Sequence, residues 1–326
     1  MTTLIKLTRE DILERLEATD RPHQADYLAM YSSWLGGIVI DPGLMLVPVD
    51  DHMVHRGDGI FEAFKCLRGS VYLLERHLDR LERSADMIHL QWPLSRPEMK
   101  EIILETIRAS QASDCLVRLF VSRGPGDFTP SPSSTVGSQL YIIVTRLKHP
   151  EASKYENGCR LRTSRVPVKP GFFANVKSCN YLQNVLMKKE AEDHSVDYAV
   201  SLDENGCLAE GPTENVCLVS ADNELLVPRF DRILRGTTMV RAMELAEELV
   251  SSHILAGVRQ AWISREDLFE AKEVLMCGTT FDVLPIVEFD GQAIGPGRPG
   301  PIYRELLERM RRDQQEGREV LTPVRG

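Results

Sequence analysis

Two charged residues in the second half of the sequence could together carry out amine chemistry. Lys177 lies in Ala174-Asn175-Val176-Lys177-Ser178-Cys179-Asn180-Tyr181-Leu182, immediately before a segment with helical periodicity. A lysine in apolar surroundings beside a helix start loses its proton readily and can bind a carbonyl group covalently. A lone lysine is more often a solvated surface charge, so this interpretation depends on the neighbouring residues.

Glu210 is the candidate partner of Lys177. It follows the turn Asp203-Glu204-Asn205-Gly206, where a glutamate could equally be ordinary turn chemistry. Enzymes that use pyridoxal phosphate need an acidic group beside the pyridine nitrogen, because the protonated ring then withdraws electrons. The sequence does not decide between Glu210 and the nearby Glu214 for this part.

Three further features could bind a phosphate group. Arg80 offers a fork of N–H donors on a predicted helix. The run Gly236-Thr237-Thr238 opens another predicted helix, where free backbone N–H groups and the helix dipole favour an anion. Gly278-Thr279-Thr280 follows a buried strand and supplies small, donor-rich backbone. Each has an ordinary alternative, namely a surface ion pair, a helix entry and a strand-end turn, but their joint occurrence favours a phosphate site.

The elements that must position these residues are helices and strands mixed along the whole chain. Apolar periodicity predicts helices at 74–88, 97–110, 180–194, 236–250 and 300–315. Strands are expected at 37–40, 44–47, 60–67, 71–74, 115–122, 139–146, 159–166, 197–202, 214–219, 224–227, 273–277 and 283–289. Because strict alternation of strand and helix is absent, the pattern favours an α+β fold with two domains.

The domain organisation follows from composition. We expect an N-terminal helical extension over 1–34, a small domain over 35–147, a polar linker over 148–157 and a large cofactor-binding domain over 158–326. The segment from Gly124 to Ser134 is a long loop rich in proline, glycine and serine, and loops of this kind are often functional.

Composition excludes several functions. The 326 residues include 39 basic and 48 acidic ones, for a net charge of −9, which argues against nucleic acid and anionic membranes as partners. No run of eighteen apolar residues predicts a membrane helix, and the first residues lack the apolar core of a signal peptide. The seven cysteines form no C-x-x-C pair, so we expect free thiols in a cytoplasmic protein and no metal site.

The sequence resembles the class IV, or fold-type IV, pyridoxal phosphate transaminases. The motifs that carry the resemblance are Arg56-Gly57-Asp58-Gly59-Ile60-Phe61-Glu62, His77-Leu78-Asp79-Arg80-Leu81, Lys177-x-x-Asn180-Tyr181-Leu182, Ala209-Glu210-Gly211 with Asn215, Leu234-x-Gly236-Thr237-Thr238, and Gly278-Thr279 with Pro285. They extend over nearly the whole chain, from about residue 35 to residue 310. The resemblance implies pyridoxal 5'-phosphate as cofactor, two α/β domains with the cofactor between them, and a homodimer.

The resemblance also implies roles for individual residues. Lys177 would hold the cofactor covalently and move the substrate's proton, and Glu210 would pair with the pyridine nitrogen. The phosphate would be bound by Arg80, Thr237, Thr238 and Thr279. Tyr181 would hydrogen-bond near the ring hydroxyl. The substrate pocket would be lined by Phe61, Ala63, Lys65, Arg118 and Thr280.

The substrate is the open part of this interpretation. Stretches such as Gly124-Pro125-Gly126-Asp127-Phe128 resemble the plastid-type group of D-amino-acid transaminases and aminodeoxychorismate lyases. We therefore expect transfer of an amino group between an amino acid, preferably a D-amino acid, and a 2-oxo acid by a ping-pong mechanism.

One departure bears on that preference. The Arg-x-His carboxylate trap of bacterial D-amino-acid transaminases is missing from the loop, which leaves Arg118, Arg123 or Lys65 to bind the carboxylate. Branched-chain L-amino-acid transamination, lyase chemistry on aminodeoxychorismate and a cofactor-binding relative without turnover are the alternatives.

Overall fold

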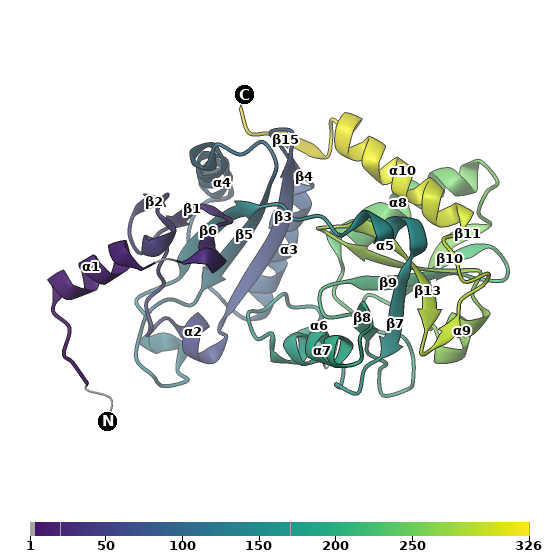
Figure 1. Ribbon diagram of the computed structural model, residues 1–326, viewed down its shortest axis with the longest axis horizontal. Helices are drawn as coiled ribbons and strands as arrows, with labels where there is room; N and C mark the ends of the chain where they lie inside the picture. The colour runs from purple at the N-terminus through teal and green to yellow at the C-terminus, as the bar shows by residue number, and fades with distance from the viewer. Residues whose placement is uncertain (1–3, 20, 170, 326) are drawn as a thin grey trace.

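Two β-sheets, each covered by helices, make up the protein. The structure, a computed structural model, describes residues 4–19, 21–169 and 171–325. Figure 1 shows the two sheets side by side along the long axis, with the N-terminal half of the chain in the first sheet and most of the C-terminal half in the second. The mixed α+β architecture agrees with the expectation from sequence.

The first sheet is antiparallel throughout and has the strand order β15-β4-β3-β5-β6-β1-β2. Its strands are β1 (Tyr27–Ser32), β2 (Gly37–Val39), β3 (Gly59–Leu67), β4 (Ser70–Tyr72), β5 (Cys115–Ser122), β6 (Gln139–Arg146) and β15 (Leu321–Pro323). The last strand brings the C-terminal end of the chain back to the N-terminal sheet, as Figure 1 shows.

Two amphipathic helices, α3 (Leu74–Met87) and α4 (Arg96–Ser110), share a core with one face of this sheet. Strand β3 alternates accordingly. Ile60 and Phe64 point into this core and are fully buried, whereas Phe61 and Ala63 lie on the opposite face. The opposite face of β3 is the one available to a site between the two sheets.

The second sheet is mixed and follows the order β11-β10-β9-β12-β13-β7-β8, with β14 paired to β13. Its strands are β7 (Cys159–Thr163), β8 (Tyr198–Val200), β9 (Asn215–Val219), β10 (Glu224–Pro228), β11 (Gly257–Ala261), β12 (Glu273–Gly278), β13 (Asp282–Phe289) and β14 (Gln292–Ala293). Helices α8 (Thr237–Ser251) and α10 (Pro301–Glu316) pack on it around a second core. A third core includes Leu268 of α9 (Arg265–Glu270).

The structure differs from the sequence expectations mainly at edges and connections. Helix α1 (Arg9–Ala18) accounts for the expected N-terminal helix, but β1 belongs to the first sheet, so a boundary after residue 34 would cut that sheet. The expected strand at 44–47 does not form, since Pro42–Leu44 is a 3-10 turn and residues 45–48 have no regular secondary structure. Helix α5 (Ala152–Asn157) lies within the expected linker. The elements that were not predicted are β1, β11, β14, β15, α2 (His52–Arg56), α6 (Gly171–Ala174) and α9.

The remaining helices are α2 (His52–Arg56), α6 (Gly171–Ala174) and α7 (Leu182–Asp193). Figure 1 places α6 and α7 together at the lower edge, beneath the space between the sheets. Within the part of the chain that the structure describes, no helix has the length and apolar character needed to cross a membrane.

Candidate active site

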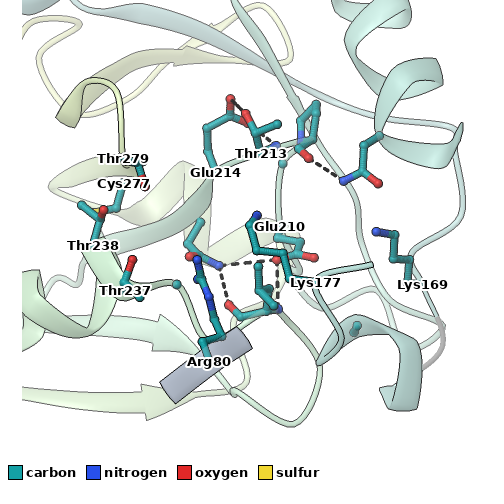
Figure 2. Close-up of a pocket in the computed structure, with 18 of the residues that line it drawn as sticks. Arg80, Lys169, Lys177, Glu210, Thr213, Glu214, Thr237, Thr238, Cys277 and Thr279 are labelled. Carbon is teal, nitrogen blue, oxygen red and sulfur yellow. Dashed lines mark hydrogen bonds between the residues drawn. The ribbon is translucent and has the colours of Figure 1, made fainter. Parts of the chain in front are cut away.

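One cavity collects the predicted chemical residues from both halves of the chain. Its wall includes Arg80 of α3, Lys177 before α7, Glu210 after β8, Thr237 and Thr238 at the start of α8, and Thr279 after β12. Figure 2 shows Arg80 and the three threonines at one end of the cavity, Lys177 and Glu210 near its middle, and Lys169 at the other end.

The segment that carries Lys177 is fixed to the first sheet by its backbone. Lys177 O accepts a hydrogen bond of 2.9 Å from Phe61 N, and Cys179 N donates one of 2.8 Å to Gly59 O. The close approach depends on Gly57, which has a φ of +67° and whose added Cβ would lie 3.2 Å from Asn180. Strand β3 therefore positions the lysine of the second half of the chain.

The Lys177 ammonium is disfavoured where it lies. Burial, aided by the positive charge of Arg80, lowers the pKa of Lys177 from 10.5 to about 8. The Nζ atom is 4.4 Å from the centre of the Phe61 ring. A lysine with such a pKa supplies a substantial fraction of neutral amine near physiological pH, which is the form that attacks a carbonyl carbon.

Glu210 is held by two donors across the same cavity. Its Oε2 accepts hydrogen bonds of 3.0 Å from Leu234 N and 3.5 Å from Asn215 Nδ2. Burial raises the pKa of Glu210 to about 7, against the lowering effect of the Leu234 N–H and of nearby lysines. A positively charged partner would therefore stabilise its ionised form strongly.

Glu214 also lies in the cavity wall, but its carboxylate is turned to its neighbour. It accepts a hydrogen bond of 2.9 Å from Thr213 N and another from the Thr213 hydroxyl, as Figure 2 shows. Because these bonds keep Glu214 in a local turn, the geometry favours Glu210 as the acid that a ring nitrogen would meet.

One end of the cavity is built to receive an anion. Helix α8 starts at the cavity, and among the described residues no side chain caps its first turn, since its N-cap is Gly236. The amides of that turn are therefore free for a ligand. A Cβ at residue 236 would lie 1.9 Å from Asn215 Oδ1, so any other residue at this helix start would have to displace the Asn215 side chain.

Arg80 reaches the same end and is supported by a residue that the sequence did not single out. Glu62 of β3 is fully buried and accepts two hydrogen bonds of 2.7 Å from Arg80, at Nε and Nη2. His77 Nδ1 lies 2.6 Å from the same carboxylate, and His77 Nε2 lies 3.2 Å from Thr237 Oγ1. The available signal was an acidic residue at a core-facing position of an otherwise apolar strand.

Tyr181 makes two contacts near the middle of the cavity, one with Phe61 and one with Lys169. Lys169 was not identified as a site residue from the sequence. The rings of Tyr181 and Phe61 meet edge to face with centres 5.1 Å apart. Lys169 Nζ lies 4.8 Å from the centre of the Tyr181 ring. Burial lowers the pKa of Lys169. The cavity therefore contains two lysines, Lys169 and Lys177, whose pKa is lower than that of an exposed lysine.

The predicted substrate-pocket residues do not all lie together in the structure. Phe61 lies next to Lys177, and Ala63 pairs with Arg118 across β3 and β5, so these three residues share the face of the sheet that looks away from its helices. The Lys65 side chain is only 2% exposed and forms an ion pair with Asp282. Thr280 adjoins Thr279. None of the five predicted substrate-pocket residues, Phe61, Ala63, Lys65, Arg118 and Thr280, is in the cavity wall itself.

The three cations considered for a substrate carboxylate differ in their partners. Arg123 donates two hydrogen bonds of 3.0 Å to Asp58, and Lys65 is paired with Asp282. Arg118 donates only to the Thr145 hydroxyl, at 3.3 Å, and forms no ion pair among the described residues. Arg118 is therefore the one of the three whose charge is uncompensated within the described chain. Burial lowers its pKa.

Nothing in the described part of the chain suggests a metal site, since no group of three or more His, Cys, Asp or Glu side chains there could hold an ion. All seven cysteines are free thiols. The chemistry of the cavity is thus that of amines, carboxylates and anion donors.

Known proteins with similar sequences and structures share this arrangement of elements. The family model for amino-transferase class IV matches residues 59–289. A chloroplastic D-amino-acid transaminase of Arabidopsis thaliana is 39% identical over 312 residues, which are 95% of this chain and 82% of the relative. A putative branched-chain-amino-acid aminotransferase of Methanocaldococcus jannaschii is 32% identical over 282 residues, 85% of this chain and 94% of the relative.

A crystal structure of the T.th. branched-chain amino acid aminotransferase in complex with N-(5'-phosphopyridoxyl)-L-glutamate is also similar. It superimposes with a TM-score of 0.82 at 25% identity, over 91% of this chain and 99% of that one. Class IV aminotransferases are enzymes that use pyridoxal phosphate. The matched region covers Arg80, Lys177, Glu210 and the start of α8, so the chain belongs to the class IV aminotransferase family.

Proposed function

We propose that this protein transfers amino groups between an amino acid, preferably a D-amino acid, and a 2-oxo acid, with pyridoxal 5'-phosphate bound in the cavity. The observation that carries the proposal is that one cavity holds a lysine with a lowered pKa, a carboxylate and an uncapped helix start. These three groups match the aldehyde, the ring nitrogen and the phosphate of that cofactor.

The donors present fit the cofactor. A phosphate dianion requires several N–H or O–H donors and positive charge. The backbone amides of Thr237 and the first turn of α8, the hydroxyl of Thr238, Thr279 and Arg80 supply these together. A protonated pyridine nitrogen requires an acceptor, which Glu210 supplies. We assign Tyr181, beside Lys169, to the neighbourhood of the ring hydroxyl.

The reaction then uses few residues. Pyridoxal phosphate supplies an aldehyde that condenses with amines and a ring that withdraws electrons. Lys177 Nζ would hold the aldehyde group of the cofactor, and as a free amine it would take the proton from the substrate Cα. Glu210 would accept a hydrogen bond from the ring nitrogen and, when ionised, would stabilise the positive charge of the ring. Phe61 covers Nζ at 4.4 Å and limits access of water.

The preference for a D-amino acid is supported by the Arabidopsis relative, which is named a D-amino-acid transaminase. The Methanocaldococcus relative, named a putative branched-chain-amino-acid aminotransferase, supports L-amino acids as the second candidate. In either case we assign the substrate carboxylate or an acidic side chain to Arg118, because the two other candidate cations are paired with carboxylates.

The test is a coupled assay of transamination with D-alanine and with L-leucine, each with 2-oxoglutarate as acceptor. We expect turnover with D-alanine, loss of turnover in Lys177→Ala, and full activity in Lys189→Ala, which changes an exposed lysine of α7. Turnover with L-leucine alone would move the enzyme to the second candidate. Activity in Lys177→Ala would contradict the assignment of the lysine.

The assembly and the compartment are further parts of the proposal. We infer a homodimer, as the family resemblance implies. The exposed apolar side chains Phe172 and Phe173 of α6 and Leu182, Val185 and Leu186 of α7 support an interface there. Light scattering on the purified protein should give twice the 36.8 kDa chain mass. The seven free thiols fit the reducing cytoplasm, which cell fractionation would test.

The division into two domains is part of the same proposal. A small domain around the first sheet and a large domain around the second would place the cavity between them, with the linker near 148–157. Limited proteolysis should cut first within that linker. A first cut inside either sheet would contradict the division.

A further inference from the structure

A fully buried carboxylate, Glu62, lies behind the anion end of the cavity and has no assigned part in the reaction. Its side chain has no exposed surface, and its two oxygens accept from Arg80 Nε, Arg80 Nη2 and His77 Nδ1 at 2.6 to 2.7 Å. A buried charge is tolerated only where it is paired and hydrogen-bonded, as it is here. Three elements meet at this group, namely β3, α3 and, through His77, α8.

The Arg80 guanidinium has five N–H groups in a rigid plane. Glu62 occupies two of them, at Nε and Nη2, and the carbonyl of Arg235 accepts a third, from Nη1 at 3.3 Å. One N–H on each terminal nitrogen remains, and these two form the end of the fork that faces away from the Nε side. Glu62 therefore fixes the plane of Arg80 and leaves its end for an anion.

His77 links Glu62 to Thr237 at the start of α8. Because the positive charge of Arg80 and the hydrogen bonds from Arg80 and His77 outweigh burial and lower the pKa of Glu62 to about 2, the carboxylate is ionised and can only accept. His77 Nδ1 must then bear a hydrogen. Burial lowers the pKa of His77 despite the opposing charge of Glu62, so Nε2 is an acceptor in the neutral ring. Thr237 then donates its hydroxyl hydrogen to His77 at 3.2 Å.

We propose that Glu62 and His77 are positioning residues for phosphate binding, Glu62 by fixing the Arg80 fork and His77 by fixing the Thr237 side chain at the start of α8. The inference rests on the proposed function, because it takes Arg80 and the backbone amide of Thr237 as phosphate ligands. Neither Glu62 nor His77 lines the cavity.

Positioning and charge repulsion by Glu62 have opposite effects on phosphate affinity, so the direction in which the affinity changes in a Glu62 variant tests the proposal. A carboxylate so close to an anion site also repels the anion, so its neutralisation alone would strengthen phosphate binding. Positioning predicts the reverse, since in Glu62→Gln the amide can accept from Arg80 through one oxygen only and presents hydrogens to the remaining donors.

The experiment compares the dissociation constants of pyridoxal phosphate and of pyridoxal, measured by calorimetry on apoprotein, in wild type, Glu62→Gln, Arg80→Ala and the double variant. We expect Glu62→Gln to weaken pyridoxal phosphate by about tenfold or more and to leave pyridoxal unchanged. In the Arg80→Ala background the second substitution should add little, because the two residues act as one unit. Asp313→Asn is the matched control, since Asp313 also holds an arginine, Arg241, through two bonds away from the cavity.

The possible results distinguish a failure of the proposed phosphate site from a failure of the positioning role of Glu62. If wild type binds pyridoxal phosphate no better than pyridoxal, the proposed phosphate site fails. If wild type prefers the phosphorylated form but Glu62→Gln binds it equally or more tightly, or weakens pyridoxal to the same extent, the positioning role is overturned.

A second variant keeps the test valid if Glu62→Gln does not fold. In His77→Asn the side-chain amide can still donate toward Glu62 but cannot reach Thr237, so the same selective loss should appear in smaller measure. An unchanged ratio of the two dissociation constants in a folded His77→Asn protein would overturn the part assigned to His77.

Discussion

The charge state of Lys177 gives the most quantitative prediction. With a pKa of about 8, about a quarter of the Lys177 side chains are neutral at pH 7.5, whereas a lysine with the ordinary value of 10.5 would be neutral in about one molecule in a thousand. The reactive amine is thus about 240-fold more abundant than on an unperturbed lysine. Removing the nearby positive charge in Arg80→Ala should raise the pKa of Lys177 above 8, because Arg80 contributes to the lowering and Glu62, which opposes it, remains.

The assay is pulse labelling of the apoprotein amines with an acylating reagent across pH 6 to 11, followed by peptide mass spectrometry. Labelling of Lys177 should be half-maximal near pH 8 in wild type and at higher pH in Arg80→Ala, with exposed Lys189 as internal reference. Circular dichroism checks that the variant is folded, since it leaves Glu62 buried without its main partner. A wild-type midpoint near 10, or a downward shift in the variant, would refute the electrostatic argument.

Three other substitutions test the packing around the cavity. Asp282→Asn should lower the free energy of unfolding by about 3–5 kcal/mol in urea titrations, because it leaves the buried Lys65 ammonium without its partner; a loss below about 1 kcal/mol would show that water reaches Lys65. Gly236→Ala should keep the circular dichroism spectrum but weaken pyridoxal phosphate binding by about tenfold or more, because its Cβ would lie 1.9 Å from Asn215 Oδ1; unaltered affinity would mean that the helix start is not the anion site. Arg118→Ala should raise the KM for the amino acid by about tenfold without changing the dissociation constant of pyridoxal phosphate, and an unchanged KM would exclude Arg118 from substrate binding.

The local pattern of apolar residues in the sequence predicted the helices and strands that have a strongly apolar face. The helices α3, α4 and α8 and the central strands β3, β5, β6, β9, β12 and β13 match their expected positions to within about two residues. One missed strand, β1, is an interior strand between β6 and β2 and lies in the segment expected to be helical, whereas β11 and β15 are edge strands. Strand β11 has no buried residue, and β15 contains a proline and is three residues long, so neither shows the apolar pattern on which the prediction depended.

The candidate site was predictable in its composition but not in its contacts. Lys177, Glu210 and the threonines of α8 lie near element boundaries, and Arg80 lies within the amphipathic helix α3, and all of them line one cavity. The partners of Lys65 and Glu62 were not visible, because Lys65 meets a residue 217 positions away and Glu62 meets residues of a different element. Lys169 lies in a loop without periodicity, and only folding brings it to Tyr181.

The central claim is that Lys177 is the residue that binds the cofactor covalently. The direct measurement is to reconstitute the apoprotein with pyridoxal phosphate, reduce it with borohydride and map the modified peptide by mass spectrometry. The account predicts that the phosphopyridoxyl group is fixed on Lys177 and that Lys177→Ala retains none of it. Modification of Lys169 in the wild-type protein, or of no lysine, would contradict the account.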